Sequence, residues 1–385
     1  MPEHPGSPAP QFPGQSRDDP WKTLVRVLTA AASLYVFLLS VNLLGSGFKM
    51  FGAGFAEQLI ATTSNPFVGL FIGILATSIV QSSSMTTSMT VGFVASGVLT
   101  LEGAVPIIMG ANIGTTVTCA IVSMGHIGRK EEFRRAFAAA SVHDFFNVMA
   151  VLILFPLELA TGFLSKSAGA LSRLLVGGEA ISFASPVKQA VGPLVESIGH
   201  LAESVAGERA AILVVIVALV LLFGSLYVLV KRTKALALGR AEVIIDRFMG
   251  RSGLAGMAVG AGITAVIQSS SVTTSLLVPL AGAGIVKLEK VFPVTLGANI
   301  GTTITALLAS LAGDSRGLTI ALVHLLFNIA GIIVIYPYKP IRKIPLTLAR
   351  KLADAAVRSR RNAIFFVIGL FYALPAVLIL MDRWF

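Results

Sequence analysis

Two short runs of uncharged polar residues are the part of this sequence best suited to chemistry. Each run reads Gln-Ser-Ser-Ser, lies inside an otherwise apolar segment, and is followed after one residue by Thr-Thr-Ser. Hydroxyl and amide oxygens are hard ligands that suit alkali cations. Backbone N–H groups at a helix N-terminus can hold an oxyanion without a lysine. The candidate substrate-binding residues are Gln81, Ser82, Ser83, Ser84, Gln268, Ser269, Ser270 and Ser271.

A glycine-rich motif follows each run at the same distance. The two copies read GANIGTTVT at 110–118 and GANIGTTIT at 297–305. Glycines in a membrane span permit close helix approach or local unwinding that exposes carbonyl groups. Thr302 and Thr305 share a helix face if the helix is intact, and they could complete a cation site with the polar run. Simple packing of small residues is the alternative for this motif.

The purely structural interpretation of the polar runs is that serine and threonine hydrogen-bond across helix interfaces. About seven polar residues clustered twice and in register favour a functional site instead. A metal site at His143, Asp144 and Asn147 is conceivable, but the second copy, which keeps His324, has Leu325 in place of the aspartate. Interhelical hydrogen bonds or a continuation of an ion path explain these residues better. The sequence carries no nucleophile elbow, Walker loop or metalloprotease motif, so we do not expect an enzyme.

Composition requires a membrane around these motifs. Of the 385 residues, 55% are hydrophobic and only 13% are charged, with a mean hydropathy of +0.84. A soluble domain carries roughly a quarter charged residues, so lipid must be the solvent for most of this chain. The net charge of +11 fits basic cytoplasmic loops rather than a nucleic-acid surface. The one cysteine, Cys119, excludes an intramolecular disulfide and is expected to be a packing residue.

Hydropathy divides the chain into full spans and two longer, interrupted segments. The interrupted segments, 66–99 and 254–286, are each about 34 residues long, too short for two crossings at ~1.5 Å per residue. Two half-length helices meeting at a polar tip fit better, which predicts re-entrant hairpins buried in protein. We expect full spans at 23–45, 104–125, 137–163, 210–231, 291–312, 317–338 and 362–383.

Loop charges predict the orientation. Residues 1–22 are polar and rich in proline and glycine, which indicates a disordered cytoplasmic tail. With that tail inside, the basic loops 125–135, 231–251 and 339–361 are all cytoplasmic, as the positive-inside rule requires. Loop 164–208 then lies outside, and 341–385 forms a basic cytoplasmic segment followed by a C-terminal span. The expected location is the cell membrane, with several passes.

An internal duplication relates the two halves, 23–163 and 209–340. Gln81 aligns with Gln268 without a gap through both glycine motifs, and VHDFFN at 142–147 aligns with VHLLFN at 323–328. Three crossings plus a hairpin is an odd number, so the second copy starts from the opposite side of the membrane. The expected fold is an all-α integral membrane protein with inverted-topology repeats, seven to eight transmembrane helices and two hairpins. Such repeats with a central site are typical of secondary transporters.

The paired QSSS hairpins, the GANIGTT motifs and FRRAFAAASVHDFFN at 133–147 resemble the type II sodium-dependent phosphate cotransporters over roughly 24–340. The resemblance implies uptake of inorganic phosphate coupled to sodium by alternating access, with both QSSS segments framing the phosphate. Sodium would be the coupling ion, and no other cofactor is implied. The sodium residues suggested by the resemblance are Gln268, Ser269, Thr302, Thr305, Asn112, Thr115, Asn299 and Asn147.

Two departures from the electrogenic members leave the number of sodium ions open. This chain has Gly128 where those members carry an aspartate, and Ala298 where they carry a serine. Three alternatives to a sodium–phosphate symporter also stay open: a passive anion channel, a transporter of the same architecture for another oxyanion, and one driven by protons. Few carboxylates lie in the expected core, which weakens proton coupling.

Overall fold

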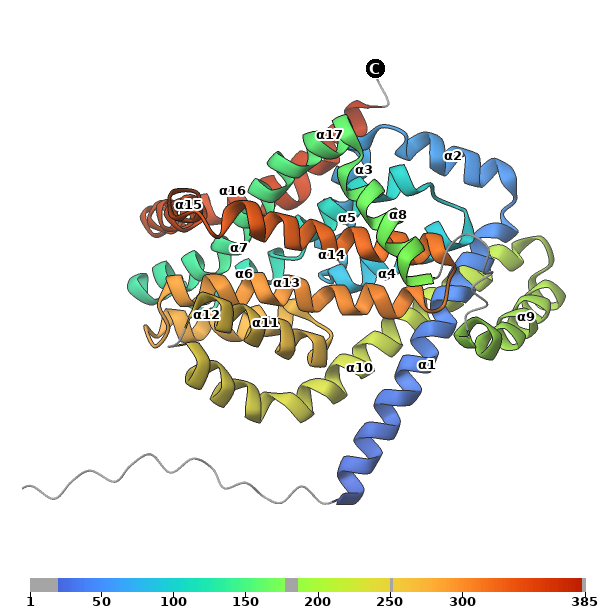
Figure 1. Ribbon diagram of the computed structural model, residues 1–385, viewed down its shortest axis with the longest axis horizontal. Coiled ribbons are helices and arrows are strands. Elements are labelled where there is room, and N and C mark those ends of the chain that lie inside the picture. Colours follow the sequence, from blue (N-terminus) through green and yellow to red (C-terminus); the bar gives the residue numbers. More distant parts are fainter. Residues whose placement is uncertain (1–19, 177–185, 250–251, 383–385) are drawn as a thin grey trace, which may run out of the picture.

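The computed structural model describes residues 20–176, 186–249 and 252–382, and within these ranges the chain is helical and has no strand (Figure 1). Seven stretches of the described chain are long and apolar enough to cross a membrane, or eight if one bent helix pair counts as a span. These stretches confirm the seven predicted spans. They are Leu24–Met50, Leu101–Met124, Lys130–Thr161, Gln189–Lys234, Leu288–Ser310, Ser315–Ile335 and Arg360–Met381.

The first repeat contains three of these stretches and one hairpin. The odd number of crossings inverts the second repeat relative to the first. Its helices are α1 (Pro20–Met50), α2 (Ala53–Thr63), α3 (Pro66–Val80), α4 (Ser83–Ser96), α5 (Leu101–Gly114), α6 (Val117–Met124) and α7 (Lys130–Thr161).

The second repeat follows two connecting helices and ends before a C-terminal extension. The connecting helices are α8 (Phe163–Val176) and α9 (Pro186–Ala206). The repeat consists of α10 (Ala210–Met249), α11 (Gly253–Ile267), α12 (Ser270–Gly282), α13 (Leu288–Ser310) and α14 (Ser315–Ile335). The extension consists of α15 (Lys339–Arg358), α16 (Arg360–Ile368), a π-helical turn and α17 (Leu374–Met381).

Both predicted hairpins are present, and the QSS residues form their turns. Gln81 and Gln268 end the first helix of each hairpin in the left-handed conformation, with φ of 56° and 62°. The next residue, Ser82 or Ser269, caps the second helix, and its hydroxyl accepts the N–H three residues on at 3.3 Å. A residue that stops one helix and a serine that starts the next therefore explain why this motif reverses the chain.

Glycines bring the same helix pair into close contact in both repeats. A Cβ atom added to Gly73 of α3 would lie 2.1 Å from the Ile107 carbonyl oxygen of α5, and one added to Gly260 of α11 would lie 2.0 Å from that of Val294 in α13. Gly110 and Gly297, in the GANIG motifs, make the reverse contact in each pair. The glycines are thus required for packing, and the duplication predicted from sequence holds at the level of backbone contacts.

The two repeats differ at one place in this shared packing. In the second repeat, α13 runs without a break through Gly301. In the first repeat, α5 ends at Gly114 and α6 begins at Val117, so the helix is interrupted at Thr115 and Thr116. The glycine motif therefore allows both of the outcomes that it predicts, an intact helix and a locally unwound one.

Helices α5, α7 and α13 form the centre of the molecule. In the most apolar part of each stretch, 83% of the residues are buried in Leu101–Met124 and 78% in Leu288–Ser310. Only 11% are buried in Arg360–Met381. Large apolar side chains such as Val220 of α10 and Phe365 of α16 are exposed on the outer helices. In a membrane protein this outward apolar surface faces lipid, while the polar runs of α4 and α12 are turned inward.

Several segments differ from expectation. Residues 164–208, predicted as a loop, are helical over most of their described part, because Leu164 and Ala168 of α8 are buried and the Glu158 carboxylate accepts the N–H of Leu164 at 2.6 Å. The cytoplasmic loop expected at 231–251 is helical up to Met249, and the basic segment after residue 341 includes α15. Residues 20–22 of the expected tail begin α1, and residues 1–19 lie outside the described part.

Candidate functional site

The turn of the second hairpin is closed against two other helices. The Thr305 hydroxyl of α13 donates to Gln268 Oε1 at 2.8 Å, and the Ser84 hydroxyl of α4 donates to the Gln268 carbonyl oxygen at 3.2 Å. The Ser84 and Thr305 hydroxyls lie 3.4 Å apart. All three side chains are buried, and the Gln268 amide nitrogen donates back to the Ala265 carbonyl. We call these three residues the Gln268 cluster; it joins side chains from both repeats.

The turn of the first hairpin has the same sequence but a different environment. Gln81 is exposed, whereas Gln268 is only 7% exposed. The repeat equivalent of Thr305 is Thr118, whose buried hydroxyl has no hydrogen-bond partner within the described residues. The helix that carries Thr118 is the interrupted one. The first tip is therefore open and the second closed.

The remaining predicted residues at the tips lie at the helix starts or face inward. Ser83, Ser84 and Ser270 are buried, and Ser271 is half-buried, so the first turns of α4 and α12 point into the protein. Thr115 and Thr302, predicted as sodium residues, are buried and donate to carbonyls of their own helices at 2.8 and 3.0 Å. Their hydroxyl oxygens can still accept or coordinate, because a hydroxyl has two lone pairs.

The predicted asparagines come together in a second buried cluster that links the repeats. Asn299 of α13 lies between His143 Nε2 at 2.6 Å and Asn147 Oδ1 at 2.9 Å, both on α7. The Asn147 amide donates to the Asn112 carbonyl at 2.7 Å, and the Asn328 amide donates to Asn112 Oδ1 at 3.2 Å. We call these five residues the asparagine cluster. It confirms the expected interhelical hydrogen bonds of this region, and it gathers three of the predicted sodium residues.

Asp144 lies beside this cluster in an unusual environment. Its side chain is fully buried, and neither carboxylate oxygen has a hydrogen-bond partner among the described residues. The nearby Thr116 hydroxyl donates to the Ile113 carbonyl at 2.8 Å instead. None of the buried polar residues in the described part is a lysine or arginine. A buried carboxylate without a donor is costly unless a cation or proton neutralises it.

Sequence reasoning missed two hydroxyl contacts of the second hairpin. The Cys119 thiol of α6, expected only to pack, lies 2.9 Å from the Thr274 hydroxyl of α12 and so links the repeats. The Thr264 hydroxyl donates to Thr273 at 2.8 Å and ties the two helices of the hairpin together. Thr264 recurs as Thr77 four residues before the other glutamine, which was a usable signal in the repeat alignment.

The two clusters offer a defined chemistry. The Gln268 cluster supplies amide, carbonyl and hydroxyl oxygens, which are ligands for a hard monovalent or divalent cation. The first N–H groups of α4 and α12 have no intrahelical partner and carry partial positive charge, so they suit a small oxyanion. Ser84 brings the start of α4 next to the turn that precedes α12. Cation and oxyanion ligands therefore lie close together.

Comparison with known proteins agrees with this chemistry. The family described as Na+/Pi-cotransporter matches residues 36–181 and 220–350. Sodium-dependent phosphate transport protein 2A of Rattus norvegicus is 36% identical, with 94% of this chain and 68% of the relative covered. Sodium-dependent phosphate transport protein 2B of Homo sapiens is 32% identical, with 91% and 64% covered.

No solved structure matches the chain. The matched ranges include both hairpins, the GANIGTT motifs and every residue of the two clusters. The relatives are transport proteins rather than enzymes, and the apolar helices make this chain a multi-pass membrane protein. The chain belongs to the Na+/Pi-cotransporter family.

Proposed function

We propose that the protein is a secondary active symporter that uses the sodium gradient to import inorganic phosphate, by alternating access at a central site between the two hairpin tips. Relatives named as sodium-dependent phosphate transport proteins supply the substrates. The inverted repeats supply the architecture, since such repeats exchange conformations in secondary transporters.

One observation carries the alternating-access part of the proposal. Two tips of identical sequence occupy different states in one molecule, closed at Gln268 and open at Gln81. If the repeats exchange states, Gln81 closes on Thr118 while Gln268 leaves Thr305, and the site opens to the other side. The buried Thr118 hydroxyl, which has no hydrogen-bond partner within the described residues, supports this exchange, because Gln81 would supply an acceptor on closing.

The substrates are assigned by ligand chemistry. Sodium binds the oxygens of Gln268, Ser269, Thr302 and Thr305, and phosphate binds the serines and the N–H groups that begin α4 and α12. Opposite charges then neutralise each other in a site that has no buried lysine or arginine among the described residues. The asparagine cluster, with Asn112, Asn147 and Asn299, extends the cation path between the repeats.

The orientation follows from the basic loops. We propose that the protein lies in the cell membrane with its N-terminus in the cytoplasm. Arg129 before α7, Lys130 at its first position and the lysines and arginines of α15 then face the cytoplasm.

Uptake of ³²P-phosphate into proteoliposomes tests the proposal. With an inward sodium gradient we expect accumulation above equilibrium, and without it only leakage. Uptake that merely equilibrates and ignores sodium would identify a passive channel. Accumulation driven by a pH gradient without sodium would identify proton coupling. Sodium-driven uptake of another oxyanion that added phosphate does not inhibit would identify a different substrate.

Variants at the closed tip sharpen the test. Gln268→Ala and Ser269→Ala should abolish sodium-coupled uptake and leave the protein folded, as judged by size-exclusion chromatography. Gln58→Ala, an exposed glutamine on α2, is the matched control and should transport like the wild type. Wild-type uptake and sodium dependence in both tip variants would remove the tip from the mechanism.

A further inference from the structure

Two arginines occupy equivalent positions in the repeats, outside both clusters. Arg135 precedes His143 by eight residues at the start of α7, and Arg316 precedes His324 by eight residues at the start of α14. Each arginine contacts the end of a hairpin that belongs to the other repeat. The residues contacted are also equivalent, since Ala95 and Gly282 both follow the tip glutamine by 14 residues.

Arg135 holds the base of the second hairpin. Its Nε donates to the Gly282 carbonyl oxygen at 2.9 Å, at the last residue of α12. Its guanidinium carbon lies 3.6 Å from the Cβ position of Gly284, which has a φ of +79°. A left-handed residue at this place turns the chain away from α12, and a side chain there would meet the guanidinium.

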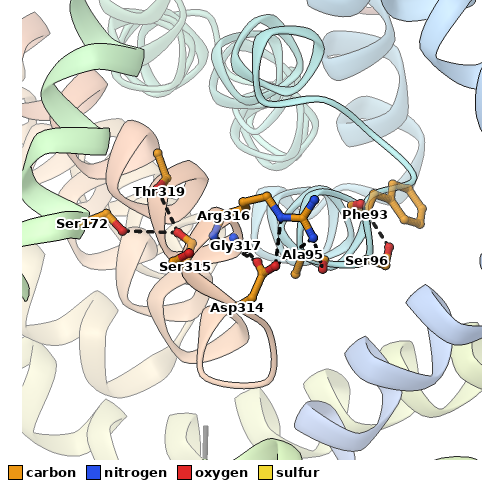
Figure 2. Close-up of polar contacts among 9 residues, drawn as sticks. All are labelled: Phe93, Ala95, Ser96, Ser172, Asp314, Ser315, Arg316, Gly317 and Thr319. Carbon is orange, nitrogen blue, oxygen red and sulfur yellow. Dashed lines mark hydrogen bonds and ion pairs between the residues drawn. The ribbon is translucent and has the colours of Figure 1, made fainter. Parts of the chain in front are cut away.

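Arg316 holds the base of the first hairpin in the same way. Figure 2 shows its side chain between Asp314, on its own turn, and Ala95 at the end of α4. Its Nη2 donates to the Ala95 carbonyl oxygen at 3.4 Å, and Nη1 lies 3.5 Å from the Cβ position of Gly97, which has a φ of +76°. The Asp314 carboxylate also lies 2.8 Å from Nη2, so this nitrogen is shared between Asp314 and Ala95. Its contact with Ala95 is therefore longer than the contact of Arg135 with Gly282.

Helix ends explain why arginine is used. The last carbonyls of a helix lack intrahelical donors and carry partial negative charge, so a cation with N–H donors stabilises them. The N–H groups of Val98 and Ile285 bond to Phe93 and Leu280, which leaves the carbonyls of Ala95 and Gly282 to the arginines.

Each contact also borders a cavity. A cavity of about 290 Å³ is lined by Arg135 and Gly284, and one of about 240 Å³ is lined by Ala95 and Ser96. Each guanidinium reaches its hairpin carbonyl at the rim of one of these cavities, and a hydrogen bond from a charged donor is stronger there than one from a neutral donor. In Figure 1, α12 lies at the left and the turn from α13 to α14 at the right, so the two contacts lie at opposite ends of the bundle.

We propose that Arg135 and Arg316 are equivalent positioning residues, each of which anchors the base of the other repeat's hairpin while the tips open and close. The proposal rests on the proposed function for its role in transport. Both contacts are present although one tip is closed and the other open, so the bases are the fixed points and the tips are the moving parts.

Cysteine labelling at each hairpin tip, measured in each arginine variant, tests the anchoring without sodium or phosphate. We call this experiment crossed labelling. A single cysteine is introduced as Ser83→Cys or Ser270→Cys, at equivalent positions that are both buried, into a Cys119→Ala background, where alanine copies the equivalent residue Ala306. Maleimide modification rates are measured on the full chain in detergent. Loss of a hydrogen bond to a charged group is expected to change exposure about tenfold.

Arg316→Gln should raise labelling at position 83 about tenfold and at position 270 less than about twofold. Arg135→Gln should do the reverse. Arg134→Gln is the matched control, because Arg134 is half-exposed and pairs with Glu131 at 2.9 Å. Arg135→Lys and Arg316→Lys, which keep a cationic donor, should label between wild type and glutamine, and they carry the test if a glutamine variant does not fold.

Uptake gives the second readout. In proteoliposomes, Arg135→Gln and Arg316→Gln should lower the maximal rate about tenfold and change the KM for phosphate by less than about twofold. Equal labelling changes at both tips, or none, would overturn the anchoring. A change confined to KM would also overturn it, because it would place the arginines in substrate binding. If the wild type shows no sodium-driven uptake but the crossed labelling holds, the proposed function fails and the anchoring stands.

Discussion

Replacement of Gly260 by alanine tests whether close backbone contact between α11 and α13 supports the closed tip. The added Cβ would lie 2.0 Å from the Val294 carbonyl oxygen, 2.9 Å from its carbon and 3.0 Å from the Ala298 nitrogen. All three atoms are backbone, so no side chain can rotate away. Because carbon and carbonyl oxygen ordinarily meet at about 3.3 Å, the two helices must separate by more than about 1 Å.

This separation has two measurable consequences. Overpacking of a core costs about 1–3 kcal/mol, and a clash between two backbones falls at the upper end. At about 2–4 °C for each kcal/mol, the melting temperature should fall by roughly 5–10 °C. The 2.8 Å bond between Thr305 on α13 and Gln268 at the end of α11 would stretch beyond hydrogen-bond length. Sodium-driven uptake should therefore fall as well.

Thermal unfolding in detergent, followed by size-exclusion chromatography, measures the first consequence. Gly262→Ala is the matched control, since Gly262 is on the same helix, is exposed, and has nothing within 4 Å of its Cβ position. Gly73→Ala, 2.1 Å from the Ile107 carbonyl oxygen, should behave like Gly260→Ala. A melting temperature within about 1 °C of wild type for Gly260→Ala would refute the close-packing argument.

Two further substitutions probe the clusters. Thr305→Val keeps the shape but removes the donor to Gln268, so half-maximal uptake should need about tenfold more sodium; an unchanged sodium titration would contradict this role. Asp144→Asn removes a buried charge that has no hydrogen bond within the described part. In sodium-free buffer the free energy of unfolding should therefore rise by about 1–3 kcal/mol, and the melting temperature with it. Sodium should stabilise the variant less than the wild type. A lower melting temperature without sodium would show that Asp144 is already neutralised.

The spans, the hairpins and the inverted duplication could be predicted from the sequence, because hydropathy and self-similarity are properties of the chain itself. The turn at Gln81 and Gln268 was also predictable in outline, since a polar interruption in an apolar segment of hairpin length leaves few alternatives. Helices α8 and α15 were harder to predict from the sequence. Their amphipathic patterns carry too many polar residues for a span, and their helical structure depends on packing against α14 and α7.

The state of each tip could not be predicted. Gln81 and Gln268 stand in the same tetrapeptide, so no local rule distinguishes the open tip from the closed one. The difference arises from partners elsewhere, namely the break at Thr115 and the contact from Ser84. The asparagine cluster was predictable as a set of polar residues but not as a network. Its hydrogen bonds depend on the angle between α7 and α13, which is a tertiary property.

The asparagine cluster has a consequence for how the protein is made. The amide of Asn112 meets that of Asn328 across 216 residues of chain. At 5–20 residues per second, a ribosome needs roughly 10–40 s to synthesise that interval. During this time Asn112 lacks its partner Asn328, and His143 and Asn147 lack their partner Asn299. In hydrocarbon such unpaired polar groups cost several kcal/mol each. The nascent first half must therefore keep these side chains hydrated or shielded by the insertion machinery until the second half arrives.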